Sequence, residues 1–535
     1  MNSSDHIAAA TKLIQAGNFD EAEALLAGAD DAPAQQLLGV ICFQTNRMTE
    51  AITYFERATR DLADDGYLQN NLGQAYRAMG DHDAAIKVFG RAAELQVEFA
   101  DPLNYLGQLQ REQGNAALAE QSFNEAINRR PGYAEAHFNL GVLLQDDARP
   151  TEAQEQYELA LHASPNHVQA YNNLGTVLDE LGDHQAAEQC YLNGLELSPE
   201  TPELLVSLGS CRRVQGRYEE ALEVFEKASN IAPDFIEARW NLGFLQLALG
   251  NCAEGWANYR YRHSVDRKVH PILQDRLPED LEGRVIELAA EQGLGDEIYF
   301  LRFAQELVAR GASITFQPDP KLNSLIRRMA DITVGEVGKD AFSIADLPYL
   351  LGSKDALPSI KIPPDEAVLA EMQARLAAAG PAPYFGVTYR AGAAGKDTLI
   401  KNAPLDGIGD ALRGTSATII DVQRLPTQEE QSQLAATVGR EVADFSEIND
   451  DLEQALALMS LLDDYVGVSN TNMHLRAAAG KPARVLVTHP GEYRWLVDGD
   501  RSPWFPDFDL YRQKPGGSWE GAFAKLASDI KAAHE

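Results

Sequence analysis

Small, apolar and aromatic positions recur along the first half of the chain with a period of 34 residues. A glycine recurs every 34 residues at seven positions, which we call the gridded glycines. Twelve residues after each of them comes an alanine, except in the seventh unit, where Gly255 stands instead. Four residues further comes an aromatic residue, from Phe55 to Tyr259. A fixed period of this length is typical of one helix–turn–helix unit copied in series. The pattern predicts a helical solenoid in which small residues let paired helices approach and a ring fills the space between them. The seven glycines are Gly39, Gly73, Gly107, Gly141, Gly175, Gly209 and Gly243.

The grid ends near Arg262, and a different pattern follows. Apolar runs now alternate with amphipathic stretches such as Glu297–Arg310, which is typical of parallel sheets covered by helices, here in two lobes. Ligands of such sheets bind at the carboxyl ends of the strands. The predicted strands are Val285–Ala290, Ser313–Gln317, Tyr384–Tyr389, Ala417–Val422, Tyr465–Val468 and Arg484–Thr488.

The two patterns together predict a multidomain chain, all-α at first and α/β afterwards. We expect a solenoid over residues 1–264, with an irregular first repeat and seven 34-residue units. A linker over 265–281 leads to a first lobe at 282–375 and a second at 376–535, which ends in a helix. The last repeat departs from the pattern at Gly255 and Arg262, so we expect it to cap the stack or to pack on the next domain.

Charge and composition narrow the function classes. A formal net charge of −34 over 535 residues argues against sequence-independent nucleic-acid binding. No signal peptide and no apolar run of membrane-spanning length is visible, so we expect a cytoplasmic protein without membrane insertion. The four cysteines are scattered without metal-ligand spacing, and no metal or other cofactor is expected.

The first predicted strand end carries two glycines followed by an acid. Gly293 and Gly295 allow close backbone approach, but Ile298 stands where a dinucleotide fingerprint needs its third glycine, so a nicotinamide or flavin cofactor is not expected. Asp296 either faces the cleft as a general base or caps the following helix, and the sequence leaves both interpretations open.

Two further strand ends carry polar residues that suit an anion. Arg390, followed by Gly392, Lys396 and Lys401, suits a diphosphate. The alternative is that these cations are ordinary surface charges without a ligand. After the predicted strand Tyr465–Val468 a polar run opens a helix, where free backbone N–H groups favour an anion, and a histidine inside that helix could donate to a phosphate oxygen. This group comprises Ser469, Asn470, Thr471, Asn472 and His474.

The 34-residue pattern resembles the tetratricopeptide repeat over roughly residues 30–262. Repeats of this family typically bind extended peptides on the concave face, and an asparagine recurs two residues before four of the gridded glycines. Because asparagine offers both a donor and an acceptor, a ladder of them could hold a peptide backbone. The alternative is that they tighten helix contacts within the repeats. These residues are Asn71, Asn139, Asn173 and Asn241.

Residues 282–535 resemble a glycosyltransferase of the two-lobed GT-B type. Gly293–Asp296 resembles the first-lobe turn of heptosyltransferase-like enzymes, in which the aspartate is the proposed base. Val466–Leu475 is similar to their donor-binding loop, with Ser469 where those enzymes usually carry Asp. Lys401 resembles, more loosely, the diphosphate-contacting lysine of O-GlcNAc-transferase-like enzymes. The Ser-Asn-Thr-Asn-x-His form, with Arg494 downstream, resembles a subgroup of bacterial repeat-bearing transferases.

The resemblance implies a protein O-glycosyltransferase, inverting and metal-independent. The repeats would recruit a protein acceptor, with flagellin the leading candidate, and the lobes would bind a nucleotide-sugar. Asp296 would act as the base, with Glu297 and Glu291 as the next candidates. Two other functions stay open: a non-catalytic scaffold with a degenerate transferase module, and a transferase acting on a glycan or lipid acceptor.

Overall fold

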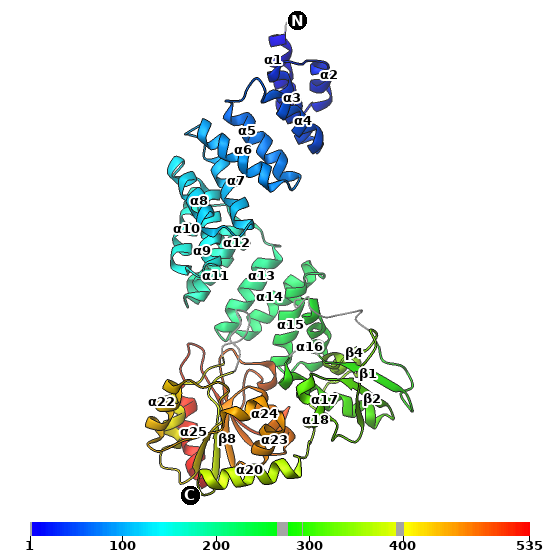
Figure 1. The fold of residues 1–535 in the computed structure, drawn as a ribbon, viewed down its shortest axis with the longest axis vertical. Coiled ribbons are helices and arrows are strands. Elements are labelled where there is room, and N and C mark those ends of the chain that lie inside the picture. The colour runs from blue at the N-terminus through cyan, green and yellow to red at the C-terminus, as the bar shows by residue number, and fades with distance from the viewer. Residues whose placement is uncertain (1–2, 265–275, 291–292, 392–400, 535) are drawn as a thin grey trace. The chain divides into compact units, whose positions relative to one another are not determined.

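The computed structural model describes residues 3–264, 276–290, 293–391 and 401–534. The chain divides into two compact units, Met1–Ser207 and Leu208–Glu535. Figure 1 traces paired helices through the first unit and, in the second, helices together with two groups of strands. Part of the predicted linker, residues 265–275, lies outside the described residues.

The first unit consists of helices joined by short turns, and each consecutive pair packs as an antiparallel hairpin. The predicted irregular first repeat is the pair α1 and α2. A last helix, α13, begins in this unit. The helices are α1 Ser3–Gln15, α2 Phe19–Leu26, α3 Ala32–Gln44, α4 Met48–Ala58, α5 Gly66–Ala78, α6 His82–Leu95, α7 Asp101–Glu112, α8 Ala116–Arg129, α9 Ala134–Asp146, α10 Pro150–Ala163, α11 Val168–Glu180, α12 His184–Leu197 and α13 Pro202–Val214.

Each gridded glycine marks the place where the two helices of a repeat touch. A Cβ added to Gly73 would lie 2.6 Å from a ring carbon of Phe89, and one added to Gly141 would lie 2.7 Å from the ring of Tyr157. Favourable carbon–carbon contacts lie at about 3.5–4.0 Å, so only glycine fits against these rings. Both rings are fully buried. In six of the seven units the 34-residue period is therefore the repetition of one glycine–aromatic contact, whereas Gly243 faces the backbone of Asn258 and Tyr259.

Prolines end the second helix of four repeats, as the sequence predicted. Helix α8 stops at Arg129, and Arg130 adopts φ −139° and ψ 87° ahead of Pro131. A proline ring disfavours helical geometry in the residue before it, so the helix ends there. The same two-residue interval separates the ends of α10, α12 and α14 (Tyr218–Ile231) from Pro165, Pro199 and Pro233.

The first lobe contains a small parallel sheet in the order β3-β2-β1-β4. Strands β1 and β2, which the sequence predicted as Val285–Ala290 and Ser313–Gln317, pair in parallel from Val285↔Ser313 to Ala289↔Gln317. Helix α17 buries most of its residues, including Tyr299, Phe300 and Phe303, in the core. The elements are β1 Val285–Ala289, α17 Leu294–Ala309, β2 Ser313–Gln317, α18 Asn323–Ile326, β3 Ile332–Val334, β4 Phe342–Ser343 and α19 Leu347–Leu350.

The second lobe contains a seven-stranded sheet in the order β10-β11-β9-β8-β5-β6-β7, parallel except for β10. From β5 the chain builds outward to β6 and β7, and then returns to place β8 on the other side of β5. This reversal creates a switch point at the carboxyl ends of β5 and β8, where open α/β sheets bind ligands. The elements are α20 Glu366–Ala379, β5 Tyr384–Val387, α21 Leu405–Leu412, β6 Thr418–Asp421, α22 Gln428–Val438, β7 Ala443–Asp444, α23 Leu452–Leu461, β8 Asp464–Val468, α24 Thr471–Ala478, β9 Ala483–Val487, β10 Arg501–Ser502, β11 Phe505–Arg512 and α25 Glu520–His534.

The sequence missed β11, the eight-residue strand that pairs in parallel with β9. Its carboxylates and a proline disguise it, because Asp507 is exposed while Phe508 and Leu510 point into the core. The short strands β3, β4, β7 and β10 were also not predicted. The lobe boundary placed at residues 375 and 376 falls inside helix α20.

The last helix pair, α15 (Ile236–Ala248) and α16 (Cys252–Tyr259), shares one hydrophobic core with the two lobes. Trp256 is 2% exposed, and its ring packs edge-on against Phe300 and Trp504. Arg262, which follows α16, pairs with the buried carboxylate of Asp346 at 2.9 Å. The prediction that this repeat packs on the next domain is confirmed.

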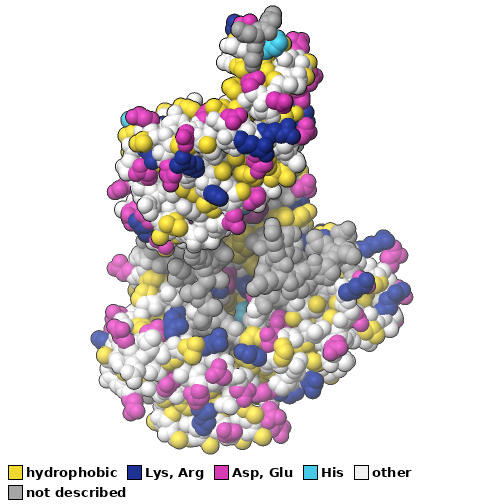
Figure 2. Space-filling model, turned by 45° about the horizontal axis from the view of Figure 1, so that its top comes forward, with side chains coloured by type: hydrophobic (Ala, Val, Ile, Leu, Met, Phe, Trp, Pro, Cys, Tyr) yellow, Lys and Arg dark blue, Asp and Glu magenta, His cyan; other side chains and the backbone are white. Residues whose placement is uncertain are grey.

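Acidic side chains on the face displayed in Figure 2 are spread over the surface rather than gathered in one patch. No helix among the described residues is both long enough and apolar enough to span a bilayer.

Candidate functional site

A cavity of about 410 Å³ opens in the Leu208–Glu535 unit at the carboxyl ends of β5, β6 and β8 and the first turn of α17. Polar groups from both lobes line it, at the switch point described above. Ten of the residues that the sequence proposed for the lobes line this one cavity: Gly293, Gly295, Asp296, Arg390, Lys401, Ser469, Asn470, Thr471, Asn472 and His474. Glu297, the next candidate for the base, is buried away from it and accepts a hydrogen bond from the amide of Asp319, and Glu291 lies outside the described residues.

Asp296 lies in the first turn of α17 and faces the cavity with a quarter of its side chain exposed. Its carboxylate accepts a long hydrogen bond of 3.4 Å from the amide of Gly293, the residue that caps the helix. It also forms an ion pair with the buried guanidinium of Arg494. The N-cap of α17 is therefore Gly293 rather than Asp296, which supports the helix start from its first turn. Asp296 presents a carboxylate to the cavity, and its role as a general base stays a prediction.

Gly295 lets α17 approach a buried histidine. A Cβ at this position would lie 2.7 Å from Cδ2 of His474, whose ring packs near Tyr299 and Phe505. Burial lowers the pKa of His474 well below its usual value, and the nearby cation of Arg494 lowers it further. The imidazole is therefore neutral at neutral pH, and its buried Nδ1 makes no hydrogen bond with the described residues.

The polar run at the start of α24 is largely engaged within the protein. Asn470 is the N-cap: its Oδ1 accepts from the amide of Met473 at 3.3 Å, and its Nδ2 donates to Thr388 at 3.1 Å. Asn472 donates a hydrogen bond of 3.2 Å to Asn449. Asn449 also lines the cavity, and the sequence analysis did not propose it. These bonds hold the helix start rigidly at the cavity wall.

A carboxylate that the sequence missed, Glu492, whose side chain is 13% exposed, pairs with the cations of the cavity. Glu492 accepts hydrogen bonds from Lys401 and, at 2.5 Å, from Ser469, and lies 3.9 Å from Arg494. Burial alone would raise the pKa of Glu492, but the charges of Lys401 and Arg494 lower it to about 2. Because Glu492 follows β9, its position after a predicted strand was a signal that could have identified it. The diphosphate lysine proposed from the sequence is therefore paired with an internal carboxylate.

The loop that carries Glu492 and Arg494 rests on the last repeat. The ring of Tyr493 lies edge-on to Phe244 in α15 and to Trp256 and Tyr259 in α16, at 5.4–5.8 Å between centroids. The amide of Val497 donates to the carbonyl of Ala248 at 2.9 Å. These contacts make α15 and α16 part of the scaffold of the cavity.

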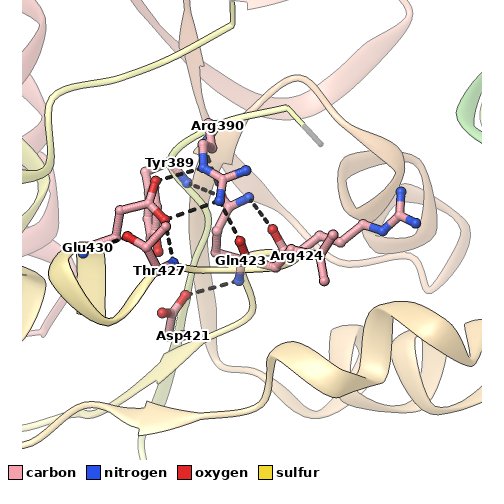
Figure 3. Close-up of polar contacts among 8 residues, drawn as sticks. Tyr389, Arg390, Asp421, Gln423, Arg424, Thr427 and Glu430 are labelled. Atoms are coloured by element: carbon pink, nitrogen blue, oxygen red, sulfur yellow. Dashed lines mark hydrogen bonds and ion pairs between the residues drawn. The ribbon is translucent and has the colours of Figure 1, made fainter. Parts of the chain in front are cut away.

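Arg390 lines the cavity as proposed, but its guanidinium is paired within the protein. Its guanidinium donates to both carboxylate oxygens of Glu430, at 2.7 and 3.1 Å, and to the carbonyl of Leu425 at 2.6 Å. Gln423 accepts from the amides of Tyr389 and Arg390 and so fixes the end of β5 (Figure 3). Gly392 and Lys396, from the same predicted motif, lie outside the described residues.

Two exposed cations that the sequence did not single out line the cavity. The side chain of Arg424 extends away from the Glu430 cluster in Figure 3, and Lys321 reaches the cavity from the first lobe. Neither side chain has an ion-pair or hydrogen-bond partner among the described residues. Among the described residues that line the cavity, they are the cations available to an anionic ligand without breaking an internal pair.

The four gridded asparagines do not present a uniform ladder. Asn139 is 9% exposed and donates to Asn104 at 2.9 Å, whereas Asn241 donates to a carbonyl of its own helix. Asn173 donates to Tyr157 at 3.3 Å, and Asn71 is half-buried. Asn139 thus joins the first helices of two neighbouring repeats, and Asn241 bonds within one helix, so neither makes the contact within a repeat that the alternative described. Asn173 lines a pocket discussed below.

Comparison with known proteins identifies the helical repeats. Tetratricopeptide-repeat family models match residues 7–66, 106–166, 64–132 and 168–200, and a model described as TPR repeat matches 212–250. The N-terminal region of about 250 residues is therefore a tetratricopeptide-repeat array, followed by an α/β region with parallel sheets.

Protein FlbA of Caulobacter vibrioides is 26% identical over 322 residues, which is 53% of either chain. The chain thus spans about half the length of this curated relative. Similar solved structures include YrrB, a TPR protein with an unusual peptide-binding site (21% identity, TM-score 0.31, 34% of this chain and 95% of that one). MamA is another (23% identity, TM-score 0.30, 32% and 93%).

Proposed function

We propose that this chain is a glycosyltransferase that moves a sugar from a nucleotide-sugar to Ser or Thr of a protein acceptor, flagellin, held by the repeats. The proposal rests on one observation: polar residues from separate strand ends line the same cavity at the switch point of the second lobe. The first turn of α17, from the first lobe, lines this cavity as well. A cavity between two such lobes suits a ligand with an anionic centre and polar ends. The resemblance to GT-B transferases supplies the reaction class.

In the proposed reaction, Asp296 takes the proton of the acceptor hydroxyl as its oxygen attacks the anomeric carbon. The bond from that carbon to the nucleotide phosphate breaks, the phosphate leaves with the electron pair, and the configuration inverts. Arg494 orients Asp296 through their ion pair. Lys401, together with the exposed Arg424 and Lys321, supplies positive charge for the leaving group, since donors fixed in place before reaction stabilise charge that develops in the transition state.

The proposal is tested by the intact mass of flagellin from a strain lacking this gene, complemented with one variant at a time. Wild type should restore the heavier flagellin, and Asp296→Asn should not, because an amide cannot accept the proton. Asp507→Asn, an exposed carboxylate on β11, is the matched control and should restore it. An unchanged mass in the deletion strain would remove flagellin as the acceptor, and full activity of Asp296→Asn would remove Asp296 as the base.

The second candidate function is a non-catalytic scaffold. It is favoured because Lys401 is paired internally with Glu492, and Asp296 with Arg494. Thermal unfolding with UDP, GDP, ADP and CMP distinguishes the two functions. A transferase should be stabilised by one of these nucleotides, and Lys401→Ala should lose that stabilisation while Lys481→Ala, an exposed lysine of the same lobe, keeps it. No shift with any nucleotide would support the scaffold.

A further inference from the structure

A second cavity, of about 690 Å³, lies within the Met1–Ser207 unit, where α9, α11 and α13 begin. Its lining is polar: Asn172 and Asn173 come from α11, His167 from the turn before that helix, and Glu135 and Glu203 from the first turns of α9 and α13. It is separate from the cavity of the lobes and shares no residue with it.

The buried group in this pocket is His167. Its side chain is 8% exposed, and its ring packs against Phe138 at 4.6 Å between centroids. Nδ1 accepts the amide of Ala170 at 3.3 Å as the cap of α11, so the proton of the neutral ring sits on Nε2. That buried N–H has no hydrogen-bond acceptor among the described residues, and the carboxylate of Glu135 lies 3.8 Å away. A buried donor without an acceptor costs free energy unless a ligand or water completes it.

Two asparagines add one free donor and one free acceptor beside it. Asn172 uses its Oδ1 to accept from Ser207 at 2.9 Å, which leaves its amide N–H groups without a partner among the described residues. Asn173 donates from its Nδ2 to Tyr157 at 3.3 Å, which leaves its Oδ1 without a donor among the residues that the structure describes. A peptide backbone offers a carbonyl and an N–H in alternation, so it matches His167 and Asn172 as donors and Asn173 as acceptor.

The charge around the pocket defines which side chain the peptide should carry. Residues 133–207 contain 13 carboxylates and a single cation, Arg149, and the pocket lining contains Glu135 and Glu203 but neither Lys nor Arg. A cationic side chain is attracted to such a surface, and an acidic one is repelled.

We propose that this pocket binds an extended peptide of the protein acceptor, with its backbone on His167, Asn172 and Asn173 and a Lys or Arg side chain between Glu135 and Glu203. The inference rests on the proposed function only in taking the ligand to be the acceptor. The polypeptide binding itself needs no transfer reaction.

The test uses the full-length chain and a positional-scanning library of seven-residue peptides with capped ends, at low ionic strength. Wild type should select Lys or Arg at one position. The double variant Glu135→Gln/Glu203→Gln should lose that preference by about threefold or more, whereas Glu155→Gln/Glu196→Gln, which removes two exposed carboxylates from α10 and α12, should keep it.

His167→Asn separates backbone contact from side-chain selection. Asparagine preserves a capping acceptor for α11 but withdraws the Nε2 donor, so binding should weaken for every library member while the Lys and Arg preference stays. Selection of acidic or apolar peptides, no selection at all, or an undiminished preference in the Glu135→Gln/Glu203→Gln variant would overturn the proposal. Because no nucleotide is present, this outcome is independent of whether the lobes transfer a sugar.

Discussion

The glycine–aromatic contact of the repeats can be tested inside a single helical hairpin. Gly73→Ala places a methyl group 2.6 Å from a ring carbon of Phe89, which is fully buried and packs beside Tyr105. Gly90 lies in the partner helix α6 with no atom within 4 Å of the position of an added Cβ, so Gly90→Ala is the matched control.

The two substitutions share one effect and differ in another. Both replace glycine by alanine inside a helix, which favours the helix by about 1 kcal/mol. Gly73→Ala also overpacks the hairpin, which typically costs about 1–3 kcal/mol because the ring must shift by roughly 1 Å in a close-packed site. The difference in the free energy of unfolding between the variants isolates the overpacking cost, with Gly90→Ala at least as stable as wild type.

Urea unfolding followed by circular dichroism gives the order of stability, and hydrogen exchange of the amides in α5 and α6 localises the effect to this repeat. Local measurement matters because repeat arrays unfold with near-neighbour rather than global cooperativity. Phe89→Leu in the Gly73→Ala background should recover part of the loss by making room for the methyl group. Equal stability of Gly73→Ala and Gly90→Ala would show that the contact does not set the repeat.

Three further outcomes are expected. Burial raises the pKa of Asp421 to about 7, so the folded chain retains a proton that the unfolded chain releases above about pH 4, and this group destabilises the fold as pH rises towards 7. Between about pH 5 and pH 8, the free energy of unfolding of Asp421→Asn, measured by urea titration, should therefore fall by roughly 2 kcal/mol less than that of wild type. Parallel pH profiles of the two proteins would contradict this. Glu492→Gln should bind pyrophosphate about tenfold more tightly by calorimetry, since Lys401 loses its internal carboxylate, and weaker binding would instead make Glu492 a residue that positions the lysine. Arg262→Ala should cost about 3–5 kcal/mol in thermal unfolding by stranding Asp346, whereas Arg262→Met/Asp346→Leu should recover most of that loss, and equal losses would show that the pair is not the cause.

The candidate site was only partly readable from the sequence. Strand ends and helix starts are local features, so Asp296, Lys401 and the run from Ser469 could be flagged, and the parallel topology brings such ends to one edge of a sheet. Which cation meets which carboxylate is not local. Glu492 is 91 residues from Lys401, and Arg494 is 198 residues from Asp296.

The sequence by itself determined the repeats, because a glycine, a ring and a proline at fixed spacing act within one hairpin, as Gly73 and Phe89 do. Only the tertiary structure decided the state of the charges in the cavity and the pairing of Arg390 with Glu430. It also decided that Trp256 joins the last repeat to the lobes, and that His167 keeps a buried donor free. The physical reason is that a periodic pattern reports contacts between near neighbours, whereas burial and ion pairing depend on side chains that the fold alone brings together.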